Sequence, residues 1–156
     1  MKGIADFKTL VRQQTWDKDV LLWLGSEKLL VATLSPNKYV TLDVLDLFQP
    51  ENLPIDDEAT KDELHRELRE RLRTIPKGPD CRTILVVKSI GLLARYETGL
   101  KEFYDWFVGS HTLVVLLMED IPEPLKWPDE IRCDAKRLVS YFAEPGMVTE
   151  VYVAKG

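Results

Sequence analysis

The chain has 156 residues, of which 45% are hydrophobic and 30% are charged, and its formal net charge at pH 7 is −5. This length and balance predict a single domain over residues 1–156 with a packed core, and they exclude a disordered chain. The negative charge also disfavours a dedicated nucleic-acid-binding module, although a local basic patch is compatible with an acidic total.

The N-terminal segment predicts an amphipathic helix, because its apolar side chains recur at helical spacing: Ile4, Phe7, Leu10 and Val11. The run Val20–Leu24 follows and stops at Gly25, which is typical of a strand buried on both faces. The next segment has two interpretations. Leu29–Leu34 and Tyr39–Leu42 can form a hairpin around a Pro-Asn turn. Alternatively, residues 27–33 form a helix that leads into a strand at the same tyrosine.

The clearest helix in the sequence is Glu58–Arg73, capped by Asp56 or Asp57. Acidic residues crowd its first turns, and arginines crowd its last turns as the helix dipole favours: Arg66, Arg69, Arg71 and Arg73. The rest of its surface, including His65, is expected to be exposed. Only a narrow apolar stripe is left to face a core: Leu64, Leu68 and Leu72.

Two more apolar runs, Thr83–Val87 and Thr112–Met118, predict further buried strands. Between them, Gly91–Arg95 leads into a helix with a core-facing stripe: Leu100, Phe103, Tyr104 and Phe107. Beyond a proline-rich loop, Asp134–Phe142 predicts a short helix and Val148–Val153 an edge strand. Three apolar runs separated by helices predict an α/β fold with a mostly parallel sheet flanked by helices on both faces.

The carboxyl ends of the strands are where a parallel α/β sheet usually binds ligands. After the first strand, Gly25–Lys28 lacks the several glycines and the lysine spacing of a phosphate-binding loop. Lys88 ends the second strand, where magnesium-nucleotide proteins place an acid. The third strand ends at Glu119 and Asp120, an adjacent pair more typical of a solvated loop than of a metal site. We therefore expect no catalytic residue, metal ligand or cofactor site.

Four side chains are candidates for binding a partner protein. Arg95 and Tyr96 leave the strand-to-helix elbow that begins at Gly91, and Arg95 is placed to reach a partner or a phosphate. Trp106 and Trp127 fall off the main apolar stripes, so they are candidates for interface anchors. For each of the four, a structural role in the elbow or in the core is the competing interpretation.

One stretch of the chain, Thr83–Asp120, is less generic than the rest. It contains Ile84–Val87, Leu113–Leu117 and, most distinctively, Gly91–Tyr96 with the sequence Gly-Leu-Leu-Ala-Arg-Tyr. These motifs cover about a quarter of the chain and resemble a module of proteins in bacterial phage-exclusion systems, namely BREX and phage growth limitation. The stretch is also similar to the Walker-B-to-sensor half of an AAA-type P-loop ATPase.

The ATPase motifs of that family do not carry over to this sequence. The Walker A consensus is missing after the first strand, and Lys88 stands where the Walker B acid belongs. Met118 ends the third strand, where a polar sensor residue is expected. The resemblance therefore implies a P-loop-NTPase-like fold without a functional Walker A and without hydrolysis.

The leading hypothesis is a non-catalytic, P-loop-like protein that binds a partner protein within an antiviral defence complex. We expect it to be soluble and cytoplasmic, because no apolar run is long enough for a leader or a membrane span and Cys81 and Cys133 suit reduced thiols. The alternative is a nucleotide- or nucleic-acid-processing enzyme whose strand-end residues converge: Lys88, Glu119 and Asp120. A third possibility is direct DNA contact through the arginine-rich end of the Glu58–Arg73 helix.

Overall fold

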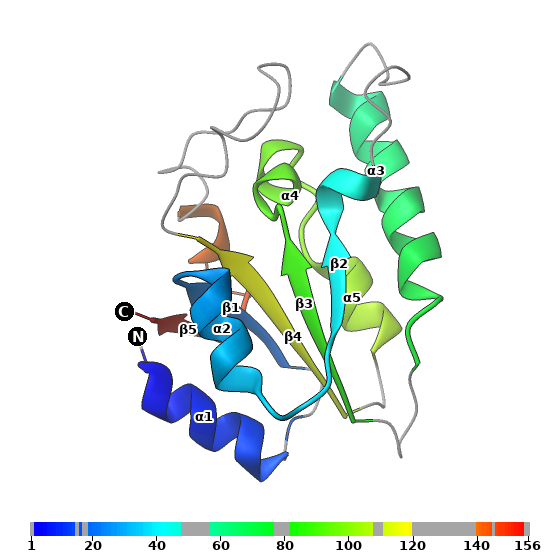
Figure 1. The fold of residues 1–156 in the computed structure, drawn as a ribbon. Coiled ribbons are helices and arrows are strands. Elements are labelled where there is room, and N and C mark those ends of the chain that lie inside the picture. The colour runs from blue at the N-terminus through cyan, green and yellow to red at the C-terminus, as the bar shows by residue number, and fades with distance from the viewer. Residues whose placement is uncertain are drawn as a thin grey trace.

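A five-stranded parallel sheet with helices on both faces forms the centre of the protein (Figure 1). The computed structural model describes residues 2–14, 16, 19–47, 57–76, 82–107, 111–119, 140–144 and 146–154. The strand order is β2-β3-β4-β1-β5, with β1 (Asp19–Leu24), β2 (Val40–Asp43), β3 (Arg82–Lys88), β4 (His111–Met118) and β5 (Glu150–Val153). Every strand pair is parallel, which confirms the predicted α/β class and is consistent with a P-loop-NTPase-like sheet.

The three central strands β1, β3 and β4 are continuous apolar runs because helices cover both of their faces. Successive side chains of a strand point to opposite faces, so β1 sends Val20 and Leu22 to one side and Leu21 and Trp23 to the other. Each face of the sheet therefore has its own hydrophobic core.

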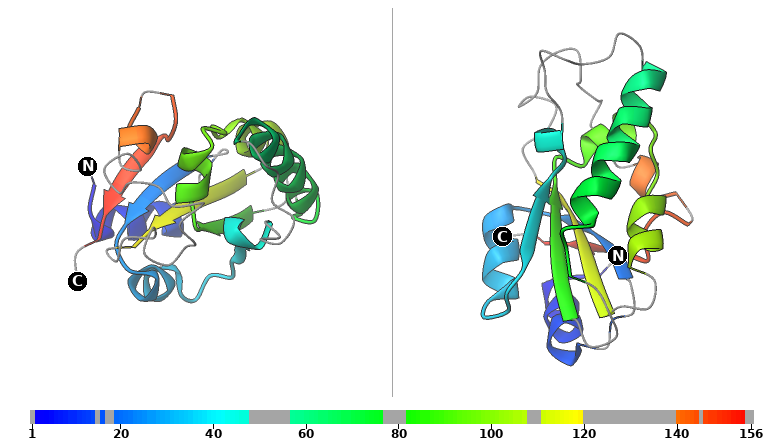
Figure 2. Two further views of the ribbon diagram at one scale, coloured as in Figure 1. Left: turned by 90° about the horizontal axis from the view of Figure 1, so that it is seen from above. Right: turned by 90° about the vertical axis from the view of Figure 1, so that its right-hand side faces the viewer.

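Helices α1 (Ile4–Gln13) and α2 (Glu27–Leu34) cover one face of the sheet. The other face carries α3 (Asp57–Leu72), α4 (Gly91–Arg95), α5 (Lys101–Trp106) and the 3-10 helix η1 (Val44–Leu47). The right-hand view of Figure 2 shows the sheet between these two layers. Among the described helices, none is long and apolar enough to span a membrane.

The chain crosses the sheet in two directions. From β1 it passes through α2 to β2 at the far edge, and it then returns through α3 to β3 and through α4 and α5 to β4. The crossover through α2 and the crossovers through α3 and through α4–α5 run in opposite directions along the sheet and lie on opposite faces. They therefore have the same handedness, as parallel βαβ units require. As a result, all strands end at one edge of the sheet, named the carboxyl edge below.

The predicted hairpin at residues 29–42 is wrong, and the helical interpretation of this segment is confirmed. Ser26 caps α2 by accepting a hydrogen bond from the backbone N–H of Leu29 at 3.1 Å. Leu30 and Leu34, four residues apart, bury the same face of the helix. β2 then pairs in parallel with β3, so it has no antiparallel partner in this segment.

The helix predicted to continue from Gly91–Arg95 is interrupted. Residues 96–100 separate α4 from α5, and the backbone there enters the left-handed region at Glu97 (φ 50°) and Gly99 (φ 71°). The hydroxyl of Tyr141 accepts a hydrogen bond from the backbone N–H of Gly99 at 2.7 Å. This break lets α5 take a direction of its own across the sheet.

Several predicted features lie outside the described residues. They include the Asp56 cap and most of the Asp134–Phe142 helix, of which residues 140–142 are helical. The others are individual side chains: Cys81, Asp120, Trp127 and Cys133. The predicted edge strand is confirmed as β5.

Gly25 joins three strands at the carboxyl edge. Its N–H donates to the carbonyl oxygen of Met118 at 3.0 Å, while the N–H of Ala154 donates to the carbonyl oxygen of Leu24 at 2.8 Å. A Cβ atom at Gly25 would lie 2.6 Å from the carbonyl oxygen of Ala154. The close approach of two backbones, and not a phosphate, therefore explains the glycine.

Replacing Gly25 by Ala is expected to destabilise the fold by about 1–3 kcal/mol, because the new methyl group must push the end of β5 away. Gly3→Ala is the matched control, since a Cβ there meets nothing within 4 Å. Urea unfolding followed by circular dichroism measures both variants. Equal losses of stability would contradict the steric explanation.

Candidate functional site

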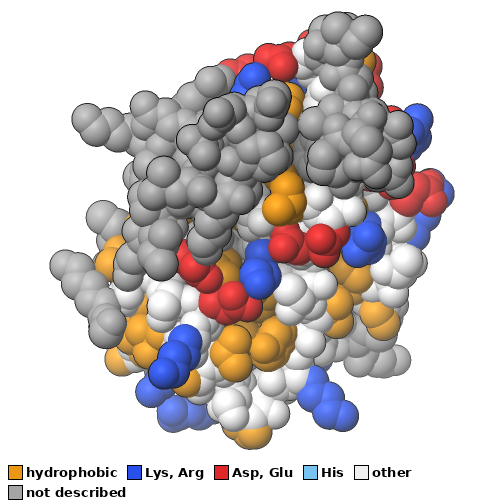
Figure 3. Space-filling model, turned by 45° about the horizontal axis from the view of Figure 1, so that its top comes forward, with side chains coloured by type: hydrophobic (Ala, Val, Ile, Leu, Met, Phe, Trp, Pro, Cys, Tyr) orange, Lys and Arg blue, Asp and Glu red, His pale blue; other side chains and the backbone are white. Residues whose placement is uncertain are grey.

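The carboxyl edge is the first place to look for a functional site, because open parallel sheets bind ligands there. Asp43 ends β2, Lys88 ends β3 and Glu119 directly follows β4. Ser26 and Glu27 follow β1 at the start of α2. Figure 3 shows acidic and basic side chains next to one another on this side of the molecule.

An ion pair occupies the middle of the carboxyl edge. Lys88 Nζ lies 3.2 Å from Glu27 Oε1, so the pair joins the end of β3 to the start of α2. Burial by itself lowers the pKa of Lys88. The hydrogen bond and charge of Glu27, helped by Asp43 and Glu119, outweigh it and raise the pKa above its ordinary value of 10.5. Lys88 is therefore a fixed cation with a partner of its own.

Side chains of the protein also lie at the N-terminus of α2. A helix N-terminus attracts anions, because its first N–H groups lack partners within the helix. Here the hydroxyl of Ser26 accepts one of these N–H bonds, and the carboxylate of Glu27 lies in the first turn. Lys88 and one N–H group of the helix end thus interact with oxygen atoms of the protein.

The acidic site of the enzyme hypothesis is only partly described. Glu119 is close enough to Lys88 to raise its pKa, whereas Asp120 lies outside the described residues. Lys88 makes its ion pair with Glu27. Within the described part of the chain, no group of three or more His, Cys, Asp or Glu residues could hold a metal ion.

The Gly91–Tyr96 motif forms a buried elbow after β3. Its leucines and its alanine are fully buried, and Tyr96 is also part of the core: Leu92, Leu93 and Ala94. Ser89, with φ 57°, turns the chain sharply before the motif. Burial raises the pKa of Tyr96. The distinctive part of the motif is thus the packing of the elbow.

Arg95 is the polar exception in this motif. Its guanidinium donates to both carboxylate oxygens of Asp57, with Nη1–Oδ2 at 3.0 Å and Nη2–Oδ1 at 3.4 Å. Its Cζ atom also lies 5.0 Å from the centre of the Tyr96 ring. Arg95 therefore attaches α4 to the first turn of α3, and its accessible side lies in a shallow surface hollow beside Lys61 and Glu97.

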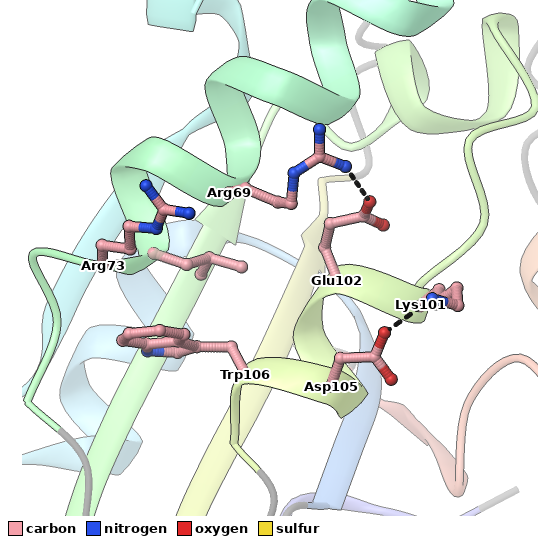
Figure 4. Close-up of a pocket in the computed structure, with 7 residues that line it drawn as sticks. Arg69, Arg73, Lys101, Glu102, Asp105 and Trp106 are labelled. Atoms are coloured by element: carbon pink, nitrogen blue, oxygen red, sulfur yellow. Dashed lines mark hydrogen bonds and ion pairs between the residues drawn. The ribbon is translucent and has the colours of Figure 1, made fainter.

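Trp106 lies elsewhere, in a pocket between α3 and α5 (Figure 4). This α3–α5 pocket has a volume of about 220 Å³. It is lined by Arg69 and Leu72 of α3, by Arg73 directly after α3, and by four residues of α5: Lys101, Glu102, Asp105 and Trp106. The arginine-rich end of α3 and one predicted anchor thus meet in one place. The structure separates this place from Arg95 and Tyr96, whereas Trp127 lies outside the described residues.

Glu102 forms the buried end of the α3–α5 pocket and is only 9% exposed. Its Oε1 interacts with His65 Nδ1 at 2.8 Å and with Arg69 Nη1 at 3.3 Å. Its Oε2 is buried and has no hydrogen-bond partner among the described residues. His65 was expected to be exposed, and it is instead partly buried by this contact.

The outer part of the pocket carries cations held by weak pairs. Arg73 Nη1 lies 2.7 Å from Glu70, and Lys101 Nζ lies 2.8 Å from Asp105. Each pair joins exposed side chains three or four residues apart in the chain, and such pairs contribute only about 0.3–0.5 kcal/mol. An approaching anion can therefore recruit Arg73 at little expense.

No protein-family model matches the chain, and no related protein is found among curated proteins.

The Lys88–Glu27 pair is testable with a double-mutant cycle of Lys88→Met and Glu27→Gln. We expect a coupling energy of about 0.5 kcal/mol near neutral pH, since partly exposed pairs contribute roughly 0.2–1 kcal/mol. Folding raises the pKa of Lys88, so this contribution is complete below the unfolded-state pKa and is lost as the pH rises through the folded-state pKa. Urea unfolding across that range measures the coupling. Coupling that persists after Lys88 has lost its proton would contradict the assignment.

Proposed function

We propose that the chain is a non-catalytic, P-loop-like α/β protein that binds a partner protein within a bacterial antiviral defence complex of the BREX kind. The ion pair between Lys88 and Glu27 is the observation that carries the non-catalytic part of this proposal. The defence setting is supported by the resemblance of the Thr83–Asp120 motifs.

Phosphoryl transfer requires free cations at the phosphate, because catalysis there is positioning plus charge stabilisation. At the carboxyl edge, the carboxylate of Glu27 already holds Lys88 and lies at the N-terminus of α2. A phosphate entering this place would meet the like charge of Glu27. This arrangement supports a protein that does not hydrolyse nucleotides.

The two edges of the sheet differ in how they are protected. At β5 the backbone of Lys2 lies along the outer side: its N–H donates to Val151 O at 3.0 Å, and its carbonyl oxygen accepts from Val153 N at 2.8 Å. At β2, no strand or bridge lies on the outer side in the part of the chain that the structure describes. An unprotected edge strand is a template for a strand of another chain.

The open edge at β2 also exposes apolar side chains. Tyr39 and Val40 are among the exposed large hydrophobic residues, with Val40 40% exposed, and Thr41 beside them is exposed as well. A partner strand that added to β2 would gain main-chain hydrogen bonds and cover these side chains. The β2 edge is therefore the surface that we assign to the partner.

Isothermal titration with ATP and magnesium tests the non-catalytic part. We expect neither micromolar binding of ATP nor release of phosphate by the wild-type chain, because the carboxylate of Glu27 pairs with Lys88 and would repel the phosphates. An active P-loop ATPase measured in parallel is the positive control. Micromolar binding with turnover would overturn this part of the proposal.

Affinity purification of the tagged chain from its native host tests the partner surface. The double variant Tyr39→Ser, Val40→Thr is expected to lose a partner that the wild-type chain retains, since both changes remove apolar surface beside the open edge. Val153→Thr makes a matched change at the edge that Lys2 covers, and it is expected to retain the partner. Retention of the partner by the double variant would argue against the β2 edge as the binding surface. A retained partner unrelated to phage defence would argue against the BREX setting alone.

A further inference from the structure

A hollow between the last turns of α1 and α2 lies at the opposite end of the strands from the carboxyl edge. Figure 1 shows both helices ending near the amino ends of the strands. This α1–α2 hollow has a volume of about 440 Å³, within the range of about 300–1,000 Å³ that is usual for small-molecule sites. The residues of its lining that bear on a ligand are Lys8 and Arg12 of α1, Ala32 of α2, and Ser35 and Asn37 directly after α2.

The charges that line the α1–α2 hollow are all positive. Lys8 and Arg12 are four residues apart on α1, so their side chains lie on the same side of the helix. Among the described residues, neither has an ion-pair partner, and no carboxylate lines the hollow. Carboxylates do line the α3–α5 pocket and the hollow beside Arg95. In a chain with 26 acidic and 21 basic residues, a hollow with cations alone indicates an anionic ligand.

The ends of the two helices do not account for both cations. The last turn of a helix favours a positive charge, which is sufficient to explain Arg12 in α1. Lys8 lies one turn earlier, and like charges four residues apart repel each other. At the end of α2, the carbonyl oxygen of Leu34 already accepts two hydrogen bonds from Asn37, one from its backbone N–H at 2.8 Å and one from its side-chain amide at 2.9 Å. An anion between Lys8 and Arg12 would remove their repulsion.

The side of the hollow that follows α2 is polar but uncharged. Ser35 is exposed, so its hydroxyl is open to a ligand and can donate or accept a hydrogen bond. Asn37 uses its side-chain amide nitrogen for Leu34, which leaves its side-chain oxygen as an acceptor. Groups of this kind match the hydroxyl groups of a ligand, because a hydroxyl both donates and accepts.

We propose that the α1–α2 hollow binds a phosphorylated sugar. The phosphate lies between Lys8 and Arg12, whose two positive charges match a dianion, and the guanidinium of Arg12 can donate two parallel hydrogen bonds to phosphate oxygens. The sugar hydroxyls lie beside Ser35 and Asn37. A ribose phosphate unit has this chemistry both as a free sugar phosphate and as one link of an RNA backbone.

Other classes of ligand fit the hollow less well. Lys8 and Arg12 would repel a metal ion. A nucleobase would find no aromatic ring to stack on among the described residues that line the hollow. An acidic peptide would pair with the two cations, but each of its carboxylates brings a single negative charge and no hydroxyl group for Ser35 and Asn37. The phosphorylated sugar matches both sides of the hollow.

Calorimetric titration of the full chain with ribose 5-phosphate, ribose, a short oligouridylate and an oligoglutamate peptide tests the proposal. We expect ribose to bind about tenfold or more weakly than ribose 5-phosphate, because it cannot make the charge-assisted hydrogen bonds. Tighter binding of the oligouridylate than of ribose 5-phosphate identifies an RNA backbone as the source of the unit, and the reverse identifies a free sugar phosphate. If neither binds at millimolar concentration, or if oligoglutamate binds as tightly, the proposal is overturned.

Charge-removing variants place the binding in this hollow. Lys8→Gln and Arg12→Gln are each expected to weaken ribose 5-phosphate about tenfold, since each removes a charge that contacts the phosphate. Lys28→Gln and Arg71→Gln are the matched controls, because both residues are exposed and neither lines the hollow. All four variants change the net charge by the same amount. Equal weakening by the controls would contradict the proposal.

A carboxylate introduced into the hollow is a second test. Ala32 is exposed and lies on α2 in the lining, so Ala32→Glu brings an anion to Lys8 and Arg12 from within the chain. We expect this variant to lose ribose 5-phosphate binding and to keep the thermal unfolding temperature of the wild type. Ala32→Gln has a side chain of the same size without the charge, and it is expected to bind more tightly than Ala32→Glu. Equal affinities of these two variants would contradict the proposal.

Discussion

The parallel sheet imposes the constraint on which the rest of the structure depends. A parallel pair cannot close through a tight hairpin, so each strand must be followed by a crossover that covers a face of the sheet. The middle residues of β1, β3 and β4 can all be apolar because two layers of helices remove them from water. The same connectivity gathers every strand end at one edge. The chain has no freedom to place its strand-end side chains elsewhere.

At that edge the polar groups interact mainly with one another. Lys88 comes from a strand whose connection covers one face, and Glu27 begins a helix that covers the other, so their pair links the two layers across the end of the sheet. Gly25 brings the end of β5 within a distance that admits no side chain. Other α/β proteins bind ligands at this edge, and here its described side chains Glu27 and Lys88 contact each other.

Prediction from the sequence succeeded where a single local pattern sufficed. The runs of β1, β3 and β4 and the stripe of α3 are periodic, and hydrophobic burial stabilises each of them wherever the partner elements lie. At residues 27–42 the Ser26 cap was a local signal for the helix, whereas the pairing of β2 is not local, because its partner β3 lies about forty residues later in the chain. The break between α4 and α5 depends on Tyr141, which follows Gly99 by 42 residues.

The candidate site was harder to predict than the fold for the same reason. His65 and Arg69 reach Glu102 over separations of 37 and 33 residues, and no motif records such contacts. One signal was present in the sequence. Glu102 directly precedes Phe103, a residue of the core-facing stripe, and an acid that is buried beside such a stripe needs a polar partner. Arg95 and Trp106 both looked like exposed anchors, yet the first attaches to Asp57 and the second lines a pocket.

The docking of α3 connects these observations. Its apolar stripe of Leu64, Leu68 and Leu72 is narrow, so the stripe alone holds the helix against the sheet but does little to fix its rotation. Polar contacts supply the rest, with Asp57 bound to Arg95 in its first turn and His65 and Arg69 bound to Glu102 further along. The contacts of His65 and Arg69 with one oxygen also orient the buried carboxylate of Glu102. The contacts that orient α3 therefore also shape the pocket beside it.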